Sequence, residues 1–279
     1  MAENLMDAKV PCMKKMHLTL LLCVMLVVAC ATSPTGRRQL MIVSEDTAIS
    51  ASKEAYVEML KPYAEKGKID NDAALKDRVY RITGRLIAQA IKMRPETKNW
   101  DWSIKIIDDP KTVNAWAMAG GKMALYTGLV IQIKPTDDEL AQVLGHEIAH
   151  ALAKHSAEKM SVGMVSSIGV AAVGIAADRK ALALTGAALA AALAVQKPNS
   201  RAAESEADQI GIELAAKAGY NPQAAITLWQ KMAQVGGQGP PQFLSTHPSP
   251  ANREKKLAEY VPEMMPYYQQ KGERPVYKL

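Results

Sequence analysis

Cysteine is scarce in this chain. Its 279 residues contain three, Cys12, Cys23 and Cys30, and all of them lie within the first thirty positions. No pair remains in the rest of the chain to form a disulfide, which excludes a disulfide-stapled scaffold there. The remainder must therefore rely on a hydrophobic core, and on a bound metal if it has one.

Aromatic residues are also few, at 5% of the chain with a single phenylalanine. The net charge is +6, and the basic residues are spread along the sequence rather than gathered in one block. Because neither a basic stripe nor interleaved aromatics are present, we expect no nucleic-acid partner. A basic surface beside anionic lipid headgroups fits this charge at least as well.

Long hydrophobic runs are missing as well. The apolar run from Leu18 to Ala29 is too short to cross a membrane, but it follows Lys14 and Lys15 as the core of a signal peptide does. The run ends in Val-Val-Ala before Cys30, which resembles a bacterial lipobox, where the cysteine carries the lipid. An ordinary signal peptide with an incidental cysteine is the alternative.

These features predict three regions. Residues 1–29 are expected to be a signal peptide, with residues 1–12 as a mis-assigned start, and residues 30–44 a lipid-anchored tether. Residues 45–279 are expected to form one domain. In the sorting rule of enteric lipoproteins, which this segment resembles, a residue other than Asp after the lipidated cysteine favours the outer membrane, and Ala31 stands there. We therefore expect the protein at the periplasmic face of the outer membrane of a Gram-negative bacterium, anchored through lipid on Cys30.

Periodicity within the domain predicts an α+β fold that is mostly α. The strand “WDWSIKIID” and a ribbon in “TVNAWAMAGGKMALYTG” form a small sheet before the histidine-rich segment. The Ala-rich stretch 160–196 is expected to be a packed helical hairpin, with membrane contact as the alternative. The other helices are expected at residues 45–66, 71–93, 136–156, 201–218 and 222–235, with a last one after “STHPSP”.

The segment “LGHEIAHALAKH” holds three of the five histidines. His146 and His150 differ by about 40° around a helix and share a face, so they can give one zinc ion two nitrogen ligands. Glu147 lies beside them, free to act as a base. His155 is about 180° from His146 on a continuous helix, so we expect it to be a structural cation near the helix end.

A catalytic zinc site needs a third protein ligand. In “SRAAESEADQIGIELAAKAG”, Glu206 shares a helical stripe with Glu213 and Lys217, and we expect this stripe to be solvated. Glu204 and Asp208 share the other face, with small residues that admit a second helix. One of these two carboxylates can bind the metal, while the other accepts a proton from a ligand imidazole.

“HEIAH” followed by “SRAAESEAD” resembles the gluzincin family of zinc metallopeptidases that includes HtpX and the CAAX-prenyl endopeptidases. Within it, the chain is most similar to the branch of periplasmic lipoprotein metallopeptidases of LoiP type. Trp116 is a departure, because Phe is commoner there, and the hairpin is unusually rich in Ala. The likeness covers roughly residues 35–260, in “TGRRQLMIVSE”, “NAWAMAGGKMALYTGL”, “LGHEIAHALAKHSAE”, “AGYNPQAAITLWQKM” and “HPSPANR”.

The resemblance implies a zincin-like metallopeptidase with a small sheet or ribbon beside the active-site helix, and one Zn²⁺ per chain. The family's E-x-x-x-D motif maps its third zinc ligand onto Glu204, with Asp208 behind it. Its H-P-x-x-x-x-R pattern maps onto His247 and Arg253. His247 is expected to stabilise the oxyanion or to sit on the zinc as a removable plug, with a purely structural turn as the alternative.

The resemblance also implies a substrate-binding edge at Asn114, Ala115, Trp116 and Ala117, although the ribbon could instead only cover the core. The expected activity is that of a zinc-dependent endopeptidase of the bacterial cell envelope. Its expected partners are polypeptide substrates, namely unfolded or misassembled envelope proteins. Two alternatives stay open: a zinc-stabilised chaperone or assembly factor with latent protease activity, and an integral membrane peptidase anchored by residues 160–196.

Overall fold

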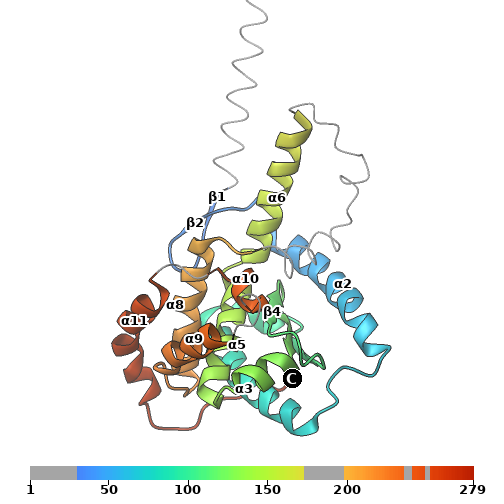
Figure 1. Cartoon of the computed structure of the whole chain (residues 1–279). Helices are drawn as coiled ribbons and strands as arrows, with labels where there is room; N and C mark the ends of the chain where they lie inside the picture. Colours follow the sequence, from blue (N-terminus) through green and yellow to red (C-terminus); the bar gives the residue numbers. More distant parts are fainter. Residues whose placement is uncertain (1–29, 173–197, 236–240, 249–251) are drawn as a thin grey trace, which may run out of the picture.

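A computed structural model of the chain describes residues 30–172, 198–235, 241–248 and 252–279, and helices make up the larger part of it (Figure 1). This α+β, mostly α architecture is the one that the sequence predicts. The helices are α2 (Glu45–Ala64), α3 (Ala73–Met93), the 3₁₀ turn η1 (Pro95–Asn99), α4 (Thr127–Ile133), α5 (Asp137–Leu152), α6 (His155–Ala172), α8 (Arg201–Lys217), α9 (Ala224–Gln234), α10 (Gln242–Thr246) and α11 (Arg253–Tyr268).

The main sheet has three strands, β3 (Ser103–Ile107), β4 (Ala115–Met118) and β5 (Lys122–Tyr126), in the order β3-β5-β4. β3 runs parallel to β5 and β4 runs antiparallel to it. The turn between β4 and β5 uses Gly120 and Gly121 at φ values of 75° and 74°, where a side chain would be strained. Because β4 stands at the end of the strand order, it is an edge strand, as the ribbon pattern predicts.

Helix α5 lies at the centre of the domain, and every residue from Glu139 to Leu152 is buried. Its start is set by a reciprocal capping box: Thr136 Oγ1 accepts a hydrogen bond from the Glu139 backbone N–H, and Glu139 Oε2 accepts one from the Thr136 N–H. α8 packs along α5, and α3, α9 and β4 cover its other sides (Figure 1). A helix enclosed in this way can carry a dry site.

The hydrophobic core consists of two clusters that meet at β4. Ala115 and Ala117 point into the larger cluster, which includes α3, α5 and α8, while Trp116 and Met118 point into a smaller one beneath α2. Successive side chains of a strand face opposite sides, which explains this division. In the smaller cluster the rings of Tyr56 and Trp116 meet edge to face at 5.8 Å.

The segment 30–44 differs from the tether that the sequence predicts. Strands β1 (Cys30–Thr32) and β2 (Arg38–Leu40) pair antiparallel, and we call residues 30–40 the amino-terminal ribbon. The ribbon is fastened to the domain, because Gln39 Nε2 donates a 2.7 Å hydrogen bond to the carbonyl of Ala153. Lipid attachment at Cys30 stays a prediction.

The helix expected at 136–156 also differs, because α5 stops at Leu152. Lys154 adopts a left-handed conformation with φ of 59°, and α6 begins at His155 in a new direction. No glycine or proline marks this break, which is why helical periodicity alone misses it. The sequence pattern likewise does not predict the short helix α4, because it follows β5 without a turn signal.

Some expectations lie outside the described residues. These are the signal peptide at 1–29, the second part of the expected hairpin at 173–197, and most of the loop at 236–242. The first part of that hairpin is α6. Among the residues that the structure describes, no helix combines the length and apolarity needed to cross a membrane.

Candidate metal centre

Four side chains bring metal-binding atoms together. His146 and His150 come from α5, Glu204 comes from α8, and His247 follows α10. One nitrogen or oxygen atom from each lies within 4.8 Å of the corresponding atoms of the others, and all four side chains are buried. The structure thus brings the three predicted ligands together, with His247 as a fourth donor at one of the two positions expected for it.

The spacing of these atoms suits a tetrahedral ion. The Nε2 atoms of His146 and His150 are 3.0 Å apart, and each lies 3.3 Å from a carboxylate oxygen of Glu204. Nδ1 of His247 lies 3.2 Å from His146 Nε2 and 3.0 Å from Glu204 Oε1. Donors about 2.1 Å from a tetrahedral zinc ion lie about 3.4 Å from one another. The four atoms therefore stand near the corners of one coordination shell.

The hydrogen-bond pattern also fits a cation. Nδ1 of His146 faces the carboxylate of Asp208 at 3.0 Å, so one ring proton lies on Nδ1. Nε2 points into the centre and would offer its lone pair to a cation bound there in place of a second proton. Glu204 Oε2 points to the same place and is buried with no hydrogen-bond partner in the described structure. Buried lone pairs without a donor are costly, and a metal ion would satisfy them together. Imidazole and carboxylate donors of this kind suit zinc.

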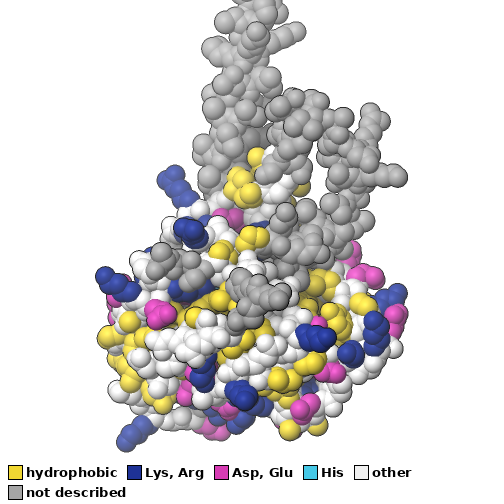
Figure 2. All heavy atoms as spheres, in the orientation of Figure 1, with side chains coloured by type: hydrophobic (Ala, Val, Ile, Leu, Met, Phe, Trp, Pro, Cys, Tyr) yellow, Lys and Arg dark blue, Asp and Glu magenta, His cyan; other side chains and the backbone are white. Residues whose placement is uncertain are grey.

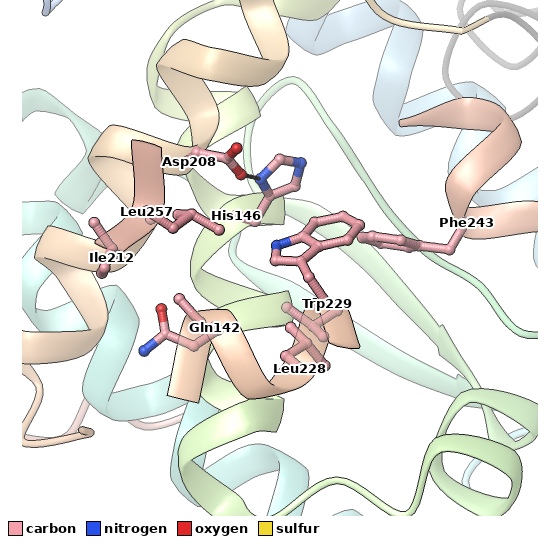
Figure 3. A pocket seen from close by; sticks show the side chains of 11 residues that line it. Gln142, His146, Asp208, Ile212, Leu228, Trp229, Phe243 and Leu257 are labelled. Atoms are coloured by element: carbon pink, nitrogen blue, oxygen red, sulfur yellow. Dashed lines mark hydrogen bonds and ion pairs between the residues drawn. The ribbon is translucent and has the colours of Figure 1, made fainter. Parts of the chain in front are cut away.

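Asp208 orients His146 and is itself held by Arg253. Figure 3 shows the Asp208 carboxylate pointing at the His146 ring from α8. The same Oδ1 accepts a 2.5 Å hydrogen bond from Arg253, whose guanidinium lies 3.4 Å from the centre of the Trp229 ring. In Figure 3 the ring of Phe243 lies next to the ring of Trp229, and the two ring centres are 5.7 Å apart. His146 is thus supported by a charged pair resting on a wall of aromatic rings.

His155 is not the structural cation at a helix end that the sequence predicts. Because α5 stops at Leu152 and Lys154 reverses the backbone, His155 folds back beside the ligand pair. Its Nδ1 lies 2.7 Å from Nδ1 of His150, and its side chain is 2% exposed. Burial lowers the pKa of His155, which disfavours the charged form of the ring.

Glu206 corrects a second expectation, because it does not lie on a solvated stripe. It is 4% exposed, and its Oε2 lies 3.2 Å from His155 Nε2 and 2.7 Å from Arg37 Nε. Glu213 and Lys217, which were expected on the same stripe, do form a surface ion pair at 2.5 Å. The amino-terminal ribbon, which supplies Arg37, is what covers Glu206.

Glu147 lies beside the donor set, next to His247. Its Oε1 lies 3.4 Å from His247 Nε2 and has no hydrogen-bond partner among the described residues. Burial raises the pKa of Glu147, which makes its carboxylate a better proton acceptor than an exposed one. Asn199 completes this side, with Nδ2 at 3.4 Å from His150 Nε2 and 3.3 Å from His247 Nδ1.

The centre is closed to large molecules in this conformation. The cavity that reaches Glu147, His150 and His247 has a volume of about 20 Å³. One water molecule needs about 10–15 Å³, so this space holds a water and not a peptide. The four histidines of the described residues are at most 4% exposed, and none is visible on the face in Figure 2.

The electrostatics of the centre favour positive charge. Burial opposes a charge on His146, but the carboxylates of Glu204 and Asp208 outweigh it and raise the pKa of His146 to about 9. Burial likewise opposes a charge on Glu204, yet His247 and His146 bring its pKa well below the usual value. The pKa of His150 falls well below its usual value because it is buried, so that ring offers a neutral nitrogen ligand.

The predicted substrate edge lies beside the centre. Ala117 lines the cavity of Glu147, whose carboxylate accepts a hydrogen bond from the Ala117 backbone. Asn114 and Ala115 precede it and are buried, and the Asn114 Nδ2 has no hydrogen-bond partner in the described structure. The Trp116 side chain points away, into the smaller core cluster. Contact with a substrate at this strand would therefore use backbone groups.

Several residues of the centre carry no clear signal in the sequence. An ideal helical wheel misplaces both His155 and Glu206. His155 follows the break between α5 and α6, and Glu206 is covered by the amino-terminal ribbon. Asn199 and Arg37 lie in stretches without periodicity. Trp229 could have been noticed, because it is one of four tryptophans and lies seven residues after Pro222.

Two histidines and a glutamate on one buried helix, completed by a carboxylate from a second helix, define a centre of the metallopeptidase class. The sequence profile of “Peptidase family M48” matches residues 73–261, more than half of the chain, and the chain belongs to this family. The family resemblance is thereby confirmed, while the LoiP-type branch stays a prediction.

Curated relatives agree with this class. The chain is 32% identical to the mitochondrial metalloendopeptidase OMA1 of Schizosaccharomyces pombe, over 82% of this chain and 65% of the relative. It is 31% identical to the putative beta-barrel assembly-enhancing protease of Vibrio cholerae, over 72% of this chain and 41% of the relative. The chain is 31% identical to the mitochondrial metalloendopeptidase OMA1 of Bos taurus, over 83% of this chain and 46% of the relative. The chain thus spans about two fifths to two thirds of these relatives.

Proposed function

We propose that the protein is a zinc-dependent endopeptidase with one Zn²⁺ per chain. The observation that supports this most is the convergence of His146 Nε2, His150 Nε2 and Glu204 within 3.3 Å of one another. Glu147 lies on the same helix as the histidines, with a free carboxylate oxygen facing the same space. Family membership and the curated relatives support the same reaction class.

The residues of the chain divide the chemistry among them. A bound zinc ion supplies Lewis acidity, which activates a water molecule and polarises the carbonyl of the peptide bond. Glu147 accepts the proton of the attacking water at Oε1 and passes it to the nitrogen that leaves when the C–N bond breaks. Asp208 and Arg253 keep the His146 lone pair aimed at the ion. Asn199 lies close enough to hold the reacting groups in place.

His247 regulates access in this proposal. Its Nδ1 occupies the fourth corner of the donor set, so it stands where the water and the substrate carbonyl must enter. The removable plug, one of the two roles expected for this residue, suits that position best. Movement of α10 would withdraw His247 and enlarge the 20 Å³ cavity to admit a peptide.

The substrates that we propose are unfolded or misassembled proteins of the bacterial cell envelope. An extended chain could pair with the edge strand β4 beside Ala117, where backbone hydrogen bonds give little sequence preference. The name of the Vibrio cholerae relative, a putative beta-barrel assembly-enhancing protease, supports this setting. We further propose a lipid anchor at Cys30 and a location at the periplasmic face of the outer membrane.

Metal analysis combined with a casein-cleavage assay tests the proposal. The purified full chain should carry one zinc ion and lose its activity on chelation. Glu204→Gln should lose zinc and cleavage. Glu213→Gln on the outer side of the same helix should keep both, because Glu213 pairs with Lys217 at the surface and is not one of the donors of the centre. A full chain that binds no zinc, or a Glu204→Gln variant with normal zinc and activity, would contradict it.

A chaperone or assembly factor with latent protease activity is the second candidate. The closed cavity and the position of His247 favour it, because a plugged centre cannot cleave. The two candidates differ in a deletion strain of the source bacterium. If Glu147→Gln restores the deletion phenotype as well as the unmodified gene does, binding is the function; if it does not, cleavage is.

A further inference from the structure

A continuous set of polar contacts joins the ligand His150 to the amino-terminal ribbon. His150 Nδ1 lies 2.7 Å from His155 Nδ1, and His155 Nε2 lies 3.2 Å from Glu206 Oε2. Arg37 Nε, from the ribbon, donates a 2.7 Å hydrogen bond to the same Oε2. Thr35 Oγ1 donates to the other carboxylate oxygen of Glu206 at 2.7 Å. All members of this set except the ribbon residues are fully buried or nearly so.

We propose that His155, Glu206 and Arg37 are positioning residues for His150, so that the amino-terminal ribbon is a working part of the metal centre. This inference rests on the proposed zinc function, and it deepens that function by assigning His150 a support of its own. Arg37 lies outside residues 73–261, the part of the chain that the family profile matches.

The proton arrangement along this set can be worked out from its fixed end. The Glu206 carboxylate only accepts hydrogen bonds, so the His155 proton lies on Nε2 and its Nδ1 keeps a lone pair. His150 must then carry its own proton on Nδ1 and donate it to His155. This leaves the His150 Nε2 lone pair directed at the ion, which is the tautomer that a metal ligand needs. The reversed arrangement would turn a lone pair of His155 Nε2 toward the Glu206 carboxylate and place a proton on His150 Nε2, where the ion binds.

The ribbon also holds the helix break that brings His155 into place. Arg37 makes a two-pronged ion pair with Glu158 of α6, at 2.7 and 2.6 Å. Gln39 Nε2 donates both to the Ala153 carbonyl and to Glu158. These contacts bracket Lys154, whose φ of 59° is unfavourable for a residue with a side chain. Removal of the ribbon contacts would free the junction to relax, and His155 would leave His150.

The two ligand histidines therefore have separate supports. His146 relies on Asp208 and Arg253, which belong to α8 and α11. His150 relies on a set that ends in the ribbon, about thirty residues before the matched family region begins. Loss of an outer support typically weakens metal binding about 10- to 100-fold. The ribbon should thus tune zinc affinity although it touches no ligand directly.

The test compares two variants with two matched controls in the full chain. Arg37→Ala removes the outer end of the set, and Glu206→Gln removes the charge that holds His155. Arg78→Ala is the control for the arginine, because Arg78 is similarly exposed and forms a 2.7 Å ion pair with Asp137 far from the centre. Glu139→Gln is the control for a buried, paired carboxylate, because Glu139 pairs with Lys231 at the start of α5 and is not one of the donors of the centre.

Zinc affinity is measured by chelator competition, and the visible spectrum of the Co²⁺-substituted protein reports the ligand geometry. Both test variants should bind zinc about 10-fold or more weakly and show an altered Co²⁺ spectrum, while both controls match the unmodified chain. Thermal unfolding with and without zinc separates positioning from simple stability, since a positioning role reduces the stabilisation that zinc provides. If Arg37→Ala does not fold, Arg37→Lys and Glu206→Gln decide the question, because Lys lacks the forked donors.

Three results would overturn the inference. Two of them leave the proposed zinc function intact, and the third overturns it as well. If the unmodified chain binds zinc and the variants bind it equally well with an unchanged Co²⁺ spectrum, only the positioning role is wrong. The same holds if the variants lower the unfolding temperature equally with and without zinc. If the unmodified chain binds no zinc, the proposed function fails and the inference fails with it.

Discussion

Gly145 of α5 and Gly211 of α8 touch through their backbones at the crossing that joins the two sides of the metal centre. A Cβ atom on Gly145 would stand 2.9 Å from the carbonyl oxygen of Gly211, and one on Gly211 would stand 2.9 Å from the backbone nitrogen of His146. No room exists there for a methyl group. This close approach is what brings Glu204 within reach of both ligand histidines.

Gly145→Ala should therefore push the two helices apart. We expect a loss of about 1–3 kcal/mol in the free energy of unfolding, as for other overpacked sites, together with weaker zinc binding. Gly211→Ala should have the same effect. The double variant should lose less free energy of unfolding than the two single variants added together, because both methyl groups open the same helix contact. Urea unfolding and chelator competition measure these effects. Unchanged stability and zinc affinity in either single variant would contradict the crossing described above.

Arg253→Lys tests the support of His146. The guanidinium bonds to Asp208 while its plane lies over Trp229, and an ammonium cannot do both. We expect zinc affinity to fall about 10-fold although the charge is kept. Arg81→Lys, a half-exposed arginine paired with Asp137 on the surface, is the control and should bind zinc normally. Equal affinities for the two variants would show that only the charge of Arg253 matters.

His247→Ala separates the two roles of that residue. If His247 is a plug at the fourth corner, its removal should open the centre and raise the rate of casein cleavage, while zinc binds somewhat less tightly. If it is mainly an oxyanion donor, the rate should instead fall about 100-fold. Cleavage rates at matched zinc content distinguish the outcomes, and a decrease would contradict the plug.

Glu139→Gln should change stability in a pH-dependent way. Burial opposes the charge of Glu139, but Lys231 and the Thr136 N–H outweigh it and lower its pKa in the folded protein. A carboxyl group with a lowered folded pKa stabilises the fold above its unfolded pKa, and this contribution is lost as the pH falls through the folded value. The variant should lose about 1–2 kcal/mol at pH 7.

The same difference should shrink as the pH falls below about 4.5, where the unfolded carboxyl group becomes protonated. Urea unfolding from pH 7 to pH 3 measures the two curves. Parallel curves over that range would show that the stability loss comes from packing and not from the charge of Glu139.

Much of the centre could be predicted from the sequence because its spacing follows regular helices. His146 and His150 share a face four residues apart, and Glu204 with Asp208 does the same on α8, so the helical wheel places all four correctly. The capping box of Thr136 and Glu139 likewise sets the start of α5. Regular periodicity is reliable wherever a helix runs unbroken and its faces differ in polarity.

The wheel fails where tertiary contacts decide. His155 lies beyond a break at Lys154 that no glycine or proline announces, so an ideal helix puts it on the wrong side. Glu206 belongs to a stripe that would be solvated if the amino-terminal ribbon did not cover it. That cover depends on Arg37, whose two ion pairs span more than a hundred positions of the chain. Such long-range pairing leaves no local pattern.

The most direct test of the account is the zinc content and casein-cleavage rate of Glu147→Gln, measured on one preparation alongside the unmodified chain. Glu147 is not one of the four residues that supply donor atoms to the centre, and its Oε1 has no hydrogen-bond partner in the described structure. We predict that the variant keeps one zinc ion per chain and loses cleavage, because the water's proton then has no acceptor. Full cleavage at normal zinc content would contradict the mechanism.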